Sequence, residues 1–158
     1  MSDTHTTLSR RRFCTGACQV ASGAAIATLV SACGGSSSPT APSGMASTLA
    51  TQSGRFTGSG VQVTVAGSAL AESGGAVLVE SVAGVFLLAR TGDGAFTAID
   101  AICSHESCTI TGAEGATYVC PCHGSRYSRS GQVLGGPATA SLRRFATTVA
   151  DGVVTIAI

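Results

Sequence analysis

From residue 61 to residue 158 the chain is a succession of short apolar or alternating runs separated by glycine-rich turns. Valines alternate with polar or small residues over 61–65, which is the period of two expected of a half-buried strand. The apolar runs 76–80 and 85–90 flank a short turn at 82–84, as in a hairpin. No window beyond the first sixty residues carries an apolar period of 3.6, so long amphipathic helices are not expected.

The second half of this region continues the same pattern. The segment 91–94 joins the second run to a further strand over 96–102. Near the C-terminus, the runs 145–149 and 153–158 are split by Asp151-Gly152, a strong signal for a two-residue hairpin turn. We therefore predict an all-β domain over 61–158, an antiparallel β-sandwich or barrel.

The N-terminal segment has the composition of an address signal. The run 9–13, Ser-Arg-Arg-Arg-Phe, resembles the twin-arginine export signal, and a weakly apolar stretch follows over 20–32. Thirteen residues are too few to cross a ~30 Å hydrocarbon core, which needs about 20. A basic start, a short apolar stretch and small residues are typical of a removable signal, which we place at 1–32; an uncleaved signal anchor that includes a few more residues on each side is the alternative.

A lipid anchor and a linker are expected next. Val30-Ser31-Ala32-Cys33 resembles a bacterial lipobox, in which Cys33 would carry lipid after cleavage; a plain signal cleaved at a small residue is the alternative. Residues 33–60 are rich in Ser, Thr, Pro and Gly and bury little apolar surface, so we predict a flexible linker there. The prediction is an exported protein held by its N-terminus at the periplasmic or extracytoplasmic face of a bacterial membrane.

The charge excludes one class of partner. The nine basic residues are all Arg, against eight acidic ones, and three of the nine lie at 10–12. Without residues 1–32 the chain keeps six Arg and seven acids, because Asp3 is also lost, and the net charge is 6 − 7 = −1. Nucleic acid is therefore not an expected partner, because phosphate binding needs concentrated positive charge.

Chemistry is concentrated in two loops within 102–138. The first is Cys103-Ser104-His105-Glu106-Ser107-Cys108, and the second is Cys120-Pro121-Cys122-His123-Gly124-Ser125-Arg126-Tyr127. Of the seven Cys and three His in the chain, every one beyond residue 33 lies in these loops. Outside them there is no His to serve as a base and no spare Cys nucleophile, so catalysis by this chain alone is not expected.

Three interpretations fit these residues. Two disulfides would use the four Cys but leave both His unexplained. A zinc site with two Cys and two His has a suitable ligand set, in a binding module without a redox role, but leaves two thiols beside the metal. An iron–sulfur centre with two thiolates on one iron and two imidazoles on the other, plus a disulfide between the loops, uses every residue.

The spacing resembles one family closely. Cys-x-His followed by Cys-Pro-Cys-His-Gly-Ser-x-Tyr resembles the high-potential Rieske proteins of quinol:cytochrome oxidoreductases. The resemblance implies a Rieske-like fold with a small two-loop subdomain and one [2Fe-2S] cluster. By position, it implies that the iron ligands are Cys103, His105, Cys120 and His123, and that a disulfide links Cys108 to Cys122. It also implies that the hydroxyls of Ser125 and Tyr127 form hydrogen bonds to cluster sulfurs and that residues 135–138 form a loop that covers the cluster.

The function implied is one-electron transfer. One residue departs from the family pattern: Glu106 stands directly after the first His, where the quinol-oxidising proteins have an apolar residue. A carboxylate is costly to desolvate in an apolar quinol pocket. We therefore expect a redox protein as partner, such as a c-type cytochrome or copper protein, or a place in a larger oxidoreductase complex. The alternative is the small Rieske subunit of a periplasmic molybdoenzyme resembling arsenite oxidase.

Overall fold

The computed structural model describes residues 46–158, so the signal predicted at 1–32 and the lipid-bearing Cys33 lie outside the described residues. Within 46–158 no helix has the length and apolarity needed to cross a bilayer. The described chain is almost entirely β-structure, with a single 3₁₀ turn, η2 (Ala69–Ala71). The predicted all-β fold is confirmed.

The strands are short, and their bounds are as follows. They are β1 (Ser47–Thr48), β2 (Ala50–Ser53), β3 (Arg55–Phe56), β4 (Gly60–Thr64), β5 (Ala76–Ser81), β6 (Gly84–Gly92), β7 (Ala95–Asp100), β8 (Gly112–Glu114), β9 (Thr117–Val119), β10 (Arg126–Ser128), β11 (Val133–Gly135), β12 (Arg144–Phe145), β13 (Thr147–Ala150) and β14 (Val153–Ala157).

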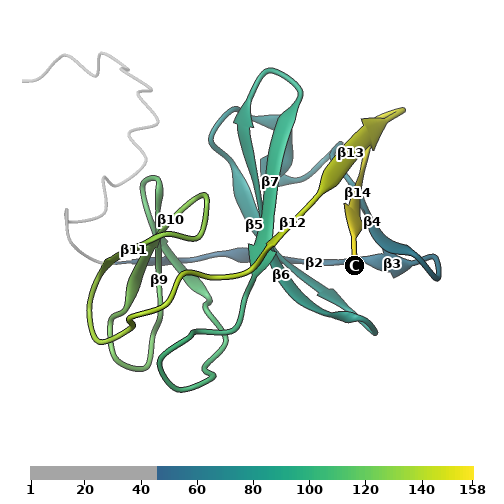
Figure 1. Cartoon of the computed structure of the whole chain (residues 1–158). Helices are drawn as coiled ribbons and strands as arrows, with labels where there is room; N and C mark the ends of the chain where they lie inside the picture. The colour runs from purple at the N-terminus through teal and green to yellow at the C-terminus, as the bar shows by residue number, and fades with distance from the viewer. Residues whose placement is uncertain (1–45) are drawn as a thin grey trace, which may run out of the picture. The chain divides into compact units, whose positions relative to one another are not determined.

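Three sheets result (Figure 1). The loop sheet has the order β1-β8-β9-β10-β11 and carries the second Cys/His loop between β9 and β10. The central sheet has the order β12-β7-β6-β5-β2, and the outer sheet has the order β13-β14-β4-β3. Every described pairing is antiparallel except that of β2 with β5.

The central sheet is buried on both faces. Leu78 and Leu87 belong to a core shared with the loop sheet, whereas Val79 and Phe86, their neighbours along β5 and β6, belong to a core shared with the outer sheet. Successive side chains of a strand point to opposite faces, so both faces of β5 need apolar residues. This two-sided burial explains why 76–79 is a continuous apolar run rather than an alternating one.

The predicted hairpins are confirmed. β5 and β6 pair in register around the turn at 82–83, and β13 and β14 pair around Asp151-Gly152. The two residues of the latter turn have φ of 50° and 72°, the left-handed values that a tight hairpin turn of this kind requires. These turns connect neighbouring strands and do not position the Cys/His loops.

The flexible linker predicted over 33–60 is wrong over 46–60; the rest of it lies outside the described residues. In this segment β1 belongs to the loop sheet, β2 to the central sheet and β3 to the outer sheet. Pairing, not local hydrophobicity, orders this polar segment: the Leu49 amide donates to the Thr111 carbonyl at 2.7 Å, and β2 lies parallel along β5. The domain therefore begins before the predicted residue 61.

Candidate iron–sulfur site

The two Cys/His loops share one backbone pattern. In the first loop, which leads from β7 to β8, the Cys103 amide donates to the Cys108 carbonyl at 2.8 Å and the Ser107 amide donates back to Cys103 at 3.0 Å. In the second, the Cys120 amide donates to Ser125 at 2.8 Å and the Gly124 amide donates back to Cys120 at 3.0 Å. Each loop therefore closes on itself, which fixes the direction of its side chains.

Each loop turns at its fifth residue in the left-handed region. That residue is Gly124 in the second loop, with φ of +70°, and Ser107 in the first, with φ of +55°. Glycine adopts this conformation at no steric cost, whereas a residue with a Cβ is strained there. The first loop is therefore held in a less relaxed backbone than the second.

A disulfide joins the loops. Cys108 and Cys122 are bonded to one another, as the family resemblance implies. Cys103 and Cys120 are the free cysteines within 46–158, and both are buried. The bond removes Cys108 and Cys122 from any ligand set and leaves two thiols with two imidazoles.

The two free thiols have opposite pKa shifts. Burial would raise the pKa of the Cys103 thiol, but hydrogen bonds from the Tyr127 hydroxyl and from the His105 backbone outweigh it, and the net pKa is lowered. Burial raises the pKa of the Cys120 thiol, and the adjacent Cys103 side chain raises it further. A thiolate therefore forms more readily at Cys103 than at Cys120.

The two histidines lie together at the exposed end of the site. The rings of His105 and His123 are 5.0 Å apart between centroids and nearly perpendicular. The His123 side chain is 47% exposed, and the His105 Nδ1 atom is buried with no hydrogen-bond partner. Glu106, 61% exposed, places its Oε2 3.6 Å from His123 Nδ1. The carboxylate therefore belongs to the same surface as the imidazoles.

Tyr127 is the centre of a hydrogen-bond cluster behind the first loop. Its hydroxyl lies 3.2 Å from the Cys103 Sγ and 3.1 Å from the Ser104 Oγ, and it accepts from the Ser104 amide at 3.3 Å. The Ser104 hydroxyl itself donates to the Ala140 carbonyl at 2.6 Å. Because that proton is already used, the Tyr127 proton is the one available to both the sulfur and the Ser104 oxygen.

Sequence reasoning missed Ser104. A serine between two predicted ligands carries no signal of its own. Its part becomes visible only when Ala140, 36 residues further along, lies against it.

Ser125 connects the second loop to the segment predicted to cover the site. The Ser125 side chain is fully buried, and its Oγ accepts from the Ala138 amide at 3.3 Å, which leaves its proton free to be donated elsewhere. The backbone of Gly136, whose φ is +85°, lies close to the backbone of Ser125: a Cβ added at Gly136 would lie 2.6 Å from the Ser125 Cα. Only glycine fits at that position, and the segment 135–138 lies against the second loop.

The donor set fits a [2Fe-2S] cluster. Such a centre needs two thiolates on one iron and two imidazoles on the other. The structure brings together two buried, disulfide-free thiols and two adjacent imidazoles, one with an orphaned buried nitrogen. The four predicted ligands therefore lie in the two loops with the donors such a cluster requires, and their ligation stays a prediction.

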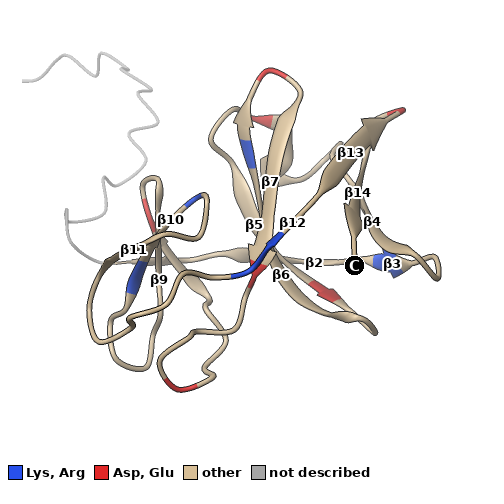
Figure 2. Cartoon of the chain, in the orientation of Figure 1, with Lys and Arg blue, Asp and Glu red and all other residues tan. Residues whose placement is uncertain are grey.

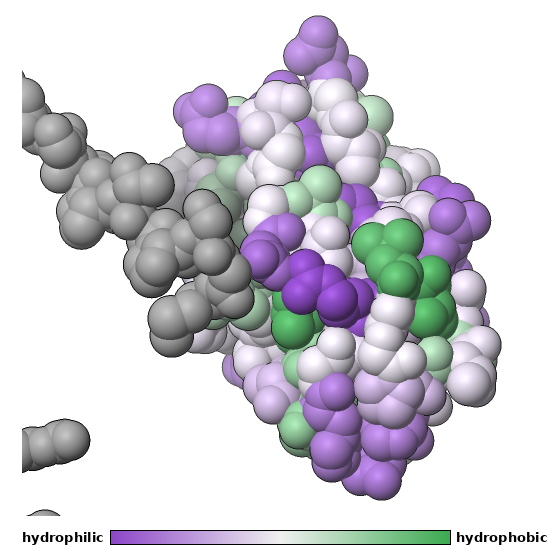
Figure 3. Space-filling view, turned by 90° about the vertical axis from the view of Figure 1, so that its left-hand side faces the viewer, coloured by the Kyte–Doolittle hydropathy of each residue, from purple (hydrophilic) through white to green (hydrophobic). Residues whose placement is uncertain are grey.

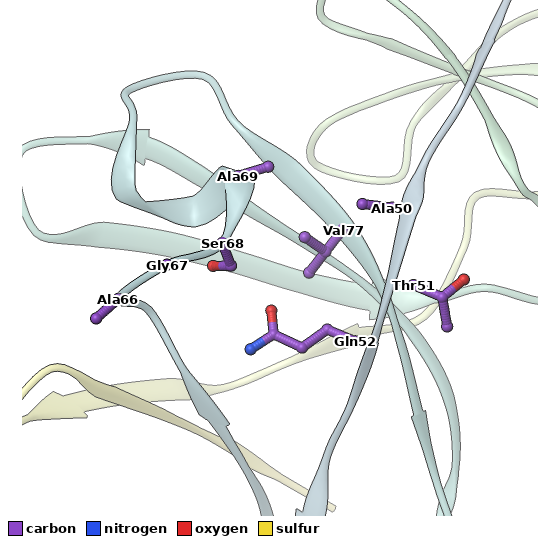
Figure 4. A pocket seen from close by; sticks show the side chains of 8 residues that line it. All are labelled: Ala50, Thr51, Gln52, Ala66, Gly67, Ser68, Ala69 and Val77. Carbon is purple, nitrogen blue, oxygen red and sulfur yellow. The ribbon is translucent and has the colours of Figure 1, made fainter.

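A separate pocket holds no comparable chemistry. A cavity of about 350 Å³ lies beside β2 and the segment 66–69, lined mostly by small side chains with Gln52 directed into it (Figure 4). The Gln52 amide already donates to the Thr64 carbonyl at 2.7 Å. No titratable or metal-ligating side chain lines this cavity, so we assign it no part in the site.

Comparison with known proteins points to one family. The family model for the Rieske [2Fe-2S] domain matches residues 58–146. The chain is 35% identical over 66 residues to the cytochrome b6-f complex iron-sulfur subunit of Chlorobaculum tepidum, covering 41% of this chain and 36% of that protein. It is 34% identical over 89 residues to the subunit of the same name from Prochlorococcus marinus, covering 54% and 50%. The matches thus span half or less of these relatives' length.

A solved structure supports the fold. The ferredoxin of Sphingomonas yanoikuyae B1 superposes with a TM-score of 0.50 at 23% identity, covering 60% of this chain and 93% of that one. At that identity the likeness concerns the fold alone.

Proposed function

The chain belongs to the Rieske [2Fe-2S] domain family, and from this premise we propose that it carries single electrons at high potential. Members of the family bind a [2Fe-2S] cluster, so the choice between zinc and iron left open by the sequence falls to the cluster. When bound, the cluster takes up and releases one electron. The remaining argument concerns what the residues of this chain do around it.

Four side chains are proposed to hold the cluster. The buried thiols of Cys103 and Cys120 suit one iron, and the imidazoles of His105, which is half-buried, and of His123, which is exposed, suit the other. Neutral imidazoles in place of two thiolates remove negative charge, which makes an added electron less costly and raises the potential. The imidazole at the surface also gives a redox partner a short approach.

The observation that carries the high-potential assignment is the Tyr127 hydroxyl 3.2 Å from the Cys103 sulfur. A hydrogen bond to a sulfur stabilises the reduced, more negative state more than the oxidised one, and so raises the potential. The Ser104 amide donates to the same phenol oxygen and polarises its O–H further. Ser125, with a proton left to donate, is placed to act on the cluster in the same way.

Redox titration of the protein containing residues 46–158 tests this proposal. Reduction should give an electron paramagnetic resonance spectrum with the low average g value of a His-ligated centre. The midpoint should lie in the upper part of the roughly −150 to +300 mV range of Rieske centres. A midpoint below zero would contradict the high-potential assignment. Stoichiometric zinc without sulfide would contradict the cluster itself.

The proposed partner is a periplasmic redox protein such as a c-type cytochrome or copper protein. Glu106 beside the imidazoles favours a polar docking surface over an apolar quinol pocket. On the face in Figure 3, hydrophobic groups form small patches with strongly hydrophilic groups between them. The relatives named as cytochrome b6-f subunits support the alternative of a place within an oxidoreductase complex.

Export and tethering are proposed from the N-terminal sequence. The twin-arginine-type run at 9–13 and the lipobox-type Cys33 lie outside the described residues, so this part rests on the sequence alone. Cys33→Ser should move the mature protein from the membrane to the soluble periplasmic fraction, because the lipid would be lost. A variant that stays on the membrane would exclude Cys33 as the anchor.

A further inference from the structure

Two arginines line one recess away from the exposed imidazoles. A cavity of about 480 Å³ is lined by Ser73, Gly74, Arg90 and Thr91 on one side and by Gly115, Ala116 and Arg129 on the other. Arg90 belongs to β6 of the central sheet, and Arg129 belongs to the turn between β10 and β11 of the loop sheet. The recess therefore lies where the loop subdomain meets the rest of the domain.

Both guanidinium groups are held in place by the fold. Arg90 donates through Nη1 to the Ala71 carbonyl at 2.7 Å and through Nε to the Gly92 carbonyl at 3.3 Å. Arg129 donates through Nη2 to the Gly115 carbonyl at 2.8 Å and lies over the ring of Tyr118, 4.4 Å from its centroid. Neither side chain needs to be ordered when a ligand binds, which lowers the entropic cost of binding.

Both groups also keep donors unused. The Arg129 Nη1 atom is buried with no hydrogen-bond partner, and the Arg90 Nη2 atom makes no hydrogen bond to the described residues. An N–H of a cation without an acceptor is costly, and an acceptor in the recess relieves that cost at the donors that it can reach there, whereas the buried Arg129 Nη1 is closed to it. Ser73, whose side chain is a hydroxyl, lines the same recess.

No carboxylate neutralises the pair. Within 46–158 the one ion pair that involves an arginine joins Arg126 to Glu114, so the acid next to Gly115 is already engaged. The recess itself is lined by no acidic residue. Two uncompensated cations in a shared recess repel one another, and an anion between them turns that repulsion into attraction.

We propose that this recess binds a small oxyanion, either inorganic or a short organic carboxylate, between Arg90 and Arg129. Guanidinium groups recognise carboxylate and phosphate through paired N–H···O bonds, and the cavity volume lies in the range of small-molecule sites. A bound oxyanion bridges the central and loop sheets and so holds the loop subdomain in place. This site is independent of the proposed electron transfer.

Calorimetric titration of the cluster-loaded protein with inorganic phosphate, sulfate and succinate tests the proposal. At least one of these anions should bind saturably at one site, and sodium chloride of matched ionic strength should not. Binding of phosphate but not succinate would identify the inorganic source, and the reverse would identify the carboxylate. Dissociation constants weaker than about 10 mM for all three would overturn the proposal.

Matched variants assign the site. Arg90→Gln and Arg129→Gln should each weaken binding at least tenfold, whereas Arg55→Gln, at an exposed position of β3 in the outer sheet, should leave it unchanged. Arg129→Lys keeps the charge but loses the planar fork, so binding should fall while the cluster absorbance and potential stay those of the wild type. Equal affinity in the Arg90→Gln/Arg129→Gln double variant would overturn the assignment.

A second readout is cluster retention. Saturating anion should slow the loss of visible cluster absorbance on heating in the wild type, because a ligand that binds only the folded state stabilises it. The same anion should have no effect in the double variant. Equal slowing in both would show a general salt effect and contradict the bridging role.

Discussion

At the scale of single residues, the phenol of Tyr127 is the side chain with the most direct effect on the site. Its proton has two possible acceptors, the Cys103 sulfur and the Ser104 oxygen. A cluster thiolate is the stronger acceptor, because charge-assisted hydrogen bonds are about twice as strong as neutral ones. Reduction adds negative charge to the sulfur and strengthens that bond further.

Removing this hydroxyl should lower the midpoint potential. Hydrogen bonds to charged groups net ~1.5–3 kcal/mol, and the part that differs between redox states sets the shift. For a one-electron couple, a tenfold change in the reduction equilibrium corresponds to 59 mV. Tyr127→Phe and Ser125→Ala should therefore each lower the midpoint potential by several tens of millivolts. Potentiometric titration measures this shift.

Tyr118 provides a matched control. It pairs directly across from Tyr127 in the loop sheet, it is equally buried, and its hydroxyl makes no hydrogen bond to either Cys/His loop. Tyr118→Phe removes the same atom from the same sheet and should leave the potential within ~10 mV, far below the effect of a lost charge-assisted bond. Equal shifts for Tyr118→Phe and Tyr127→Phe would indicate a packing effect and contradict the tuning role.

A second residue-scale prediction concerns Ser107. It occupies, with φ of +55°, the position that Gly124 occupies in the second loop. A non-glycine residue in the left-handed region costs ~1–2 kcal/mol, partly offset by the greater unfolded-state freedom of glycine. Ser107→Gly should therefore raise the thermal midpoint by a few degrees without changing the potential. The reverse change, Gly124→Ser, should lower it, and a fall in both variants would contradict this account of the turn.

At the scale of elements, the segment 47–56 holds the three sheets together. Gly54 lies where the chain passes from β2 in the central sheet to β3 in the outer sheet. Its amide donates to the Glu80 carbonyl at 2.7 Å. An added Cβ would lie 2.3 Å from the Val61 side chain and 2.8 Å from that of Val79, both fully buried. The core therefore leaves no room at this crossing.

Gly54→Ala should destabilise the domain. Overpacking a close-packed core costs ~1–3 kcal/mol, so the free energy of unfolding in urea should fall by about that amount. Gly92→Ala serves as the control for space, because no atom lies within 4 Å of the Cβ added there and its φ is not in the left-handed region. A Gly54→Ala variant at least as stable as Gly92→Ala would show that the crossing is not tightly packed.

The elements also show what the sequence could and could not predict. Strands with their own apolar pattern, such as β4 over 60–64 and the hairpin of β5 and β6, could be found by period and turn chemistry. The strand β2, Ala-Thr-Gln-Ser, has no such pattern and exists because it adds to the edge of β5. Pairing partners distant in the sequence leave no local pattern, so the sequence alone predicts a start of the domain that is too late in the chain.

The candidate site was more predictable than the fold around it. The residue types and spacings of the predicted ligands can be read from the sequence of the two loops, and the family resemblance predicts the loop-linking disulfide. The Ser104 contact with Ala140 and the recess between Arg90 and Arg129 depend on how the sheets pack. No spacing rule in one sequence could have indicated either of them.

At the scale of the whole molecule, the charged residues are few and dispersed, so the effect of each charged group has to be considered individually. Figure 2 shows acidic and basic residues distributed over all three sheets, and the described residues carry six Arg and seven acids. No strong overall field is expected to steer a partner from a distance. A single carboxylate at the docking surface therefore has a proportionally large effect on the encounter.

Glu106 is that carboxylate, because it lies beside His123 at the exposed end of the proposed cluster site. Glu106→Gln should lower the second-order rate of electron transfer to a positively charged c-type cytochrome two- to fivefold at 0.01 M ionic strength, as expected for loss of electrostatic complementarity. The difference should vanish near 1 M, because the Debye length falls from 30 Å to 3 Å. Asp151→Asn removes an equal charge from the β13–β14 turn in the outer sheet, and its rates should match the wild type. Stopped-flow rates across this salt range measure both variants. If they slow equally, net charge rather than local docking governs the encounter, and the partner surface proposed around Glu106 is wrong.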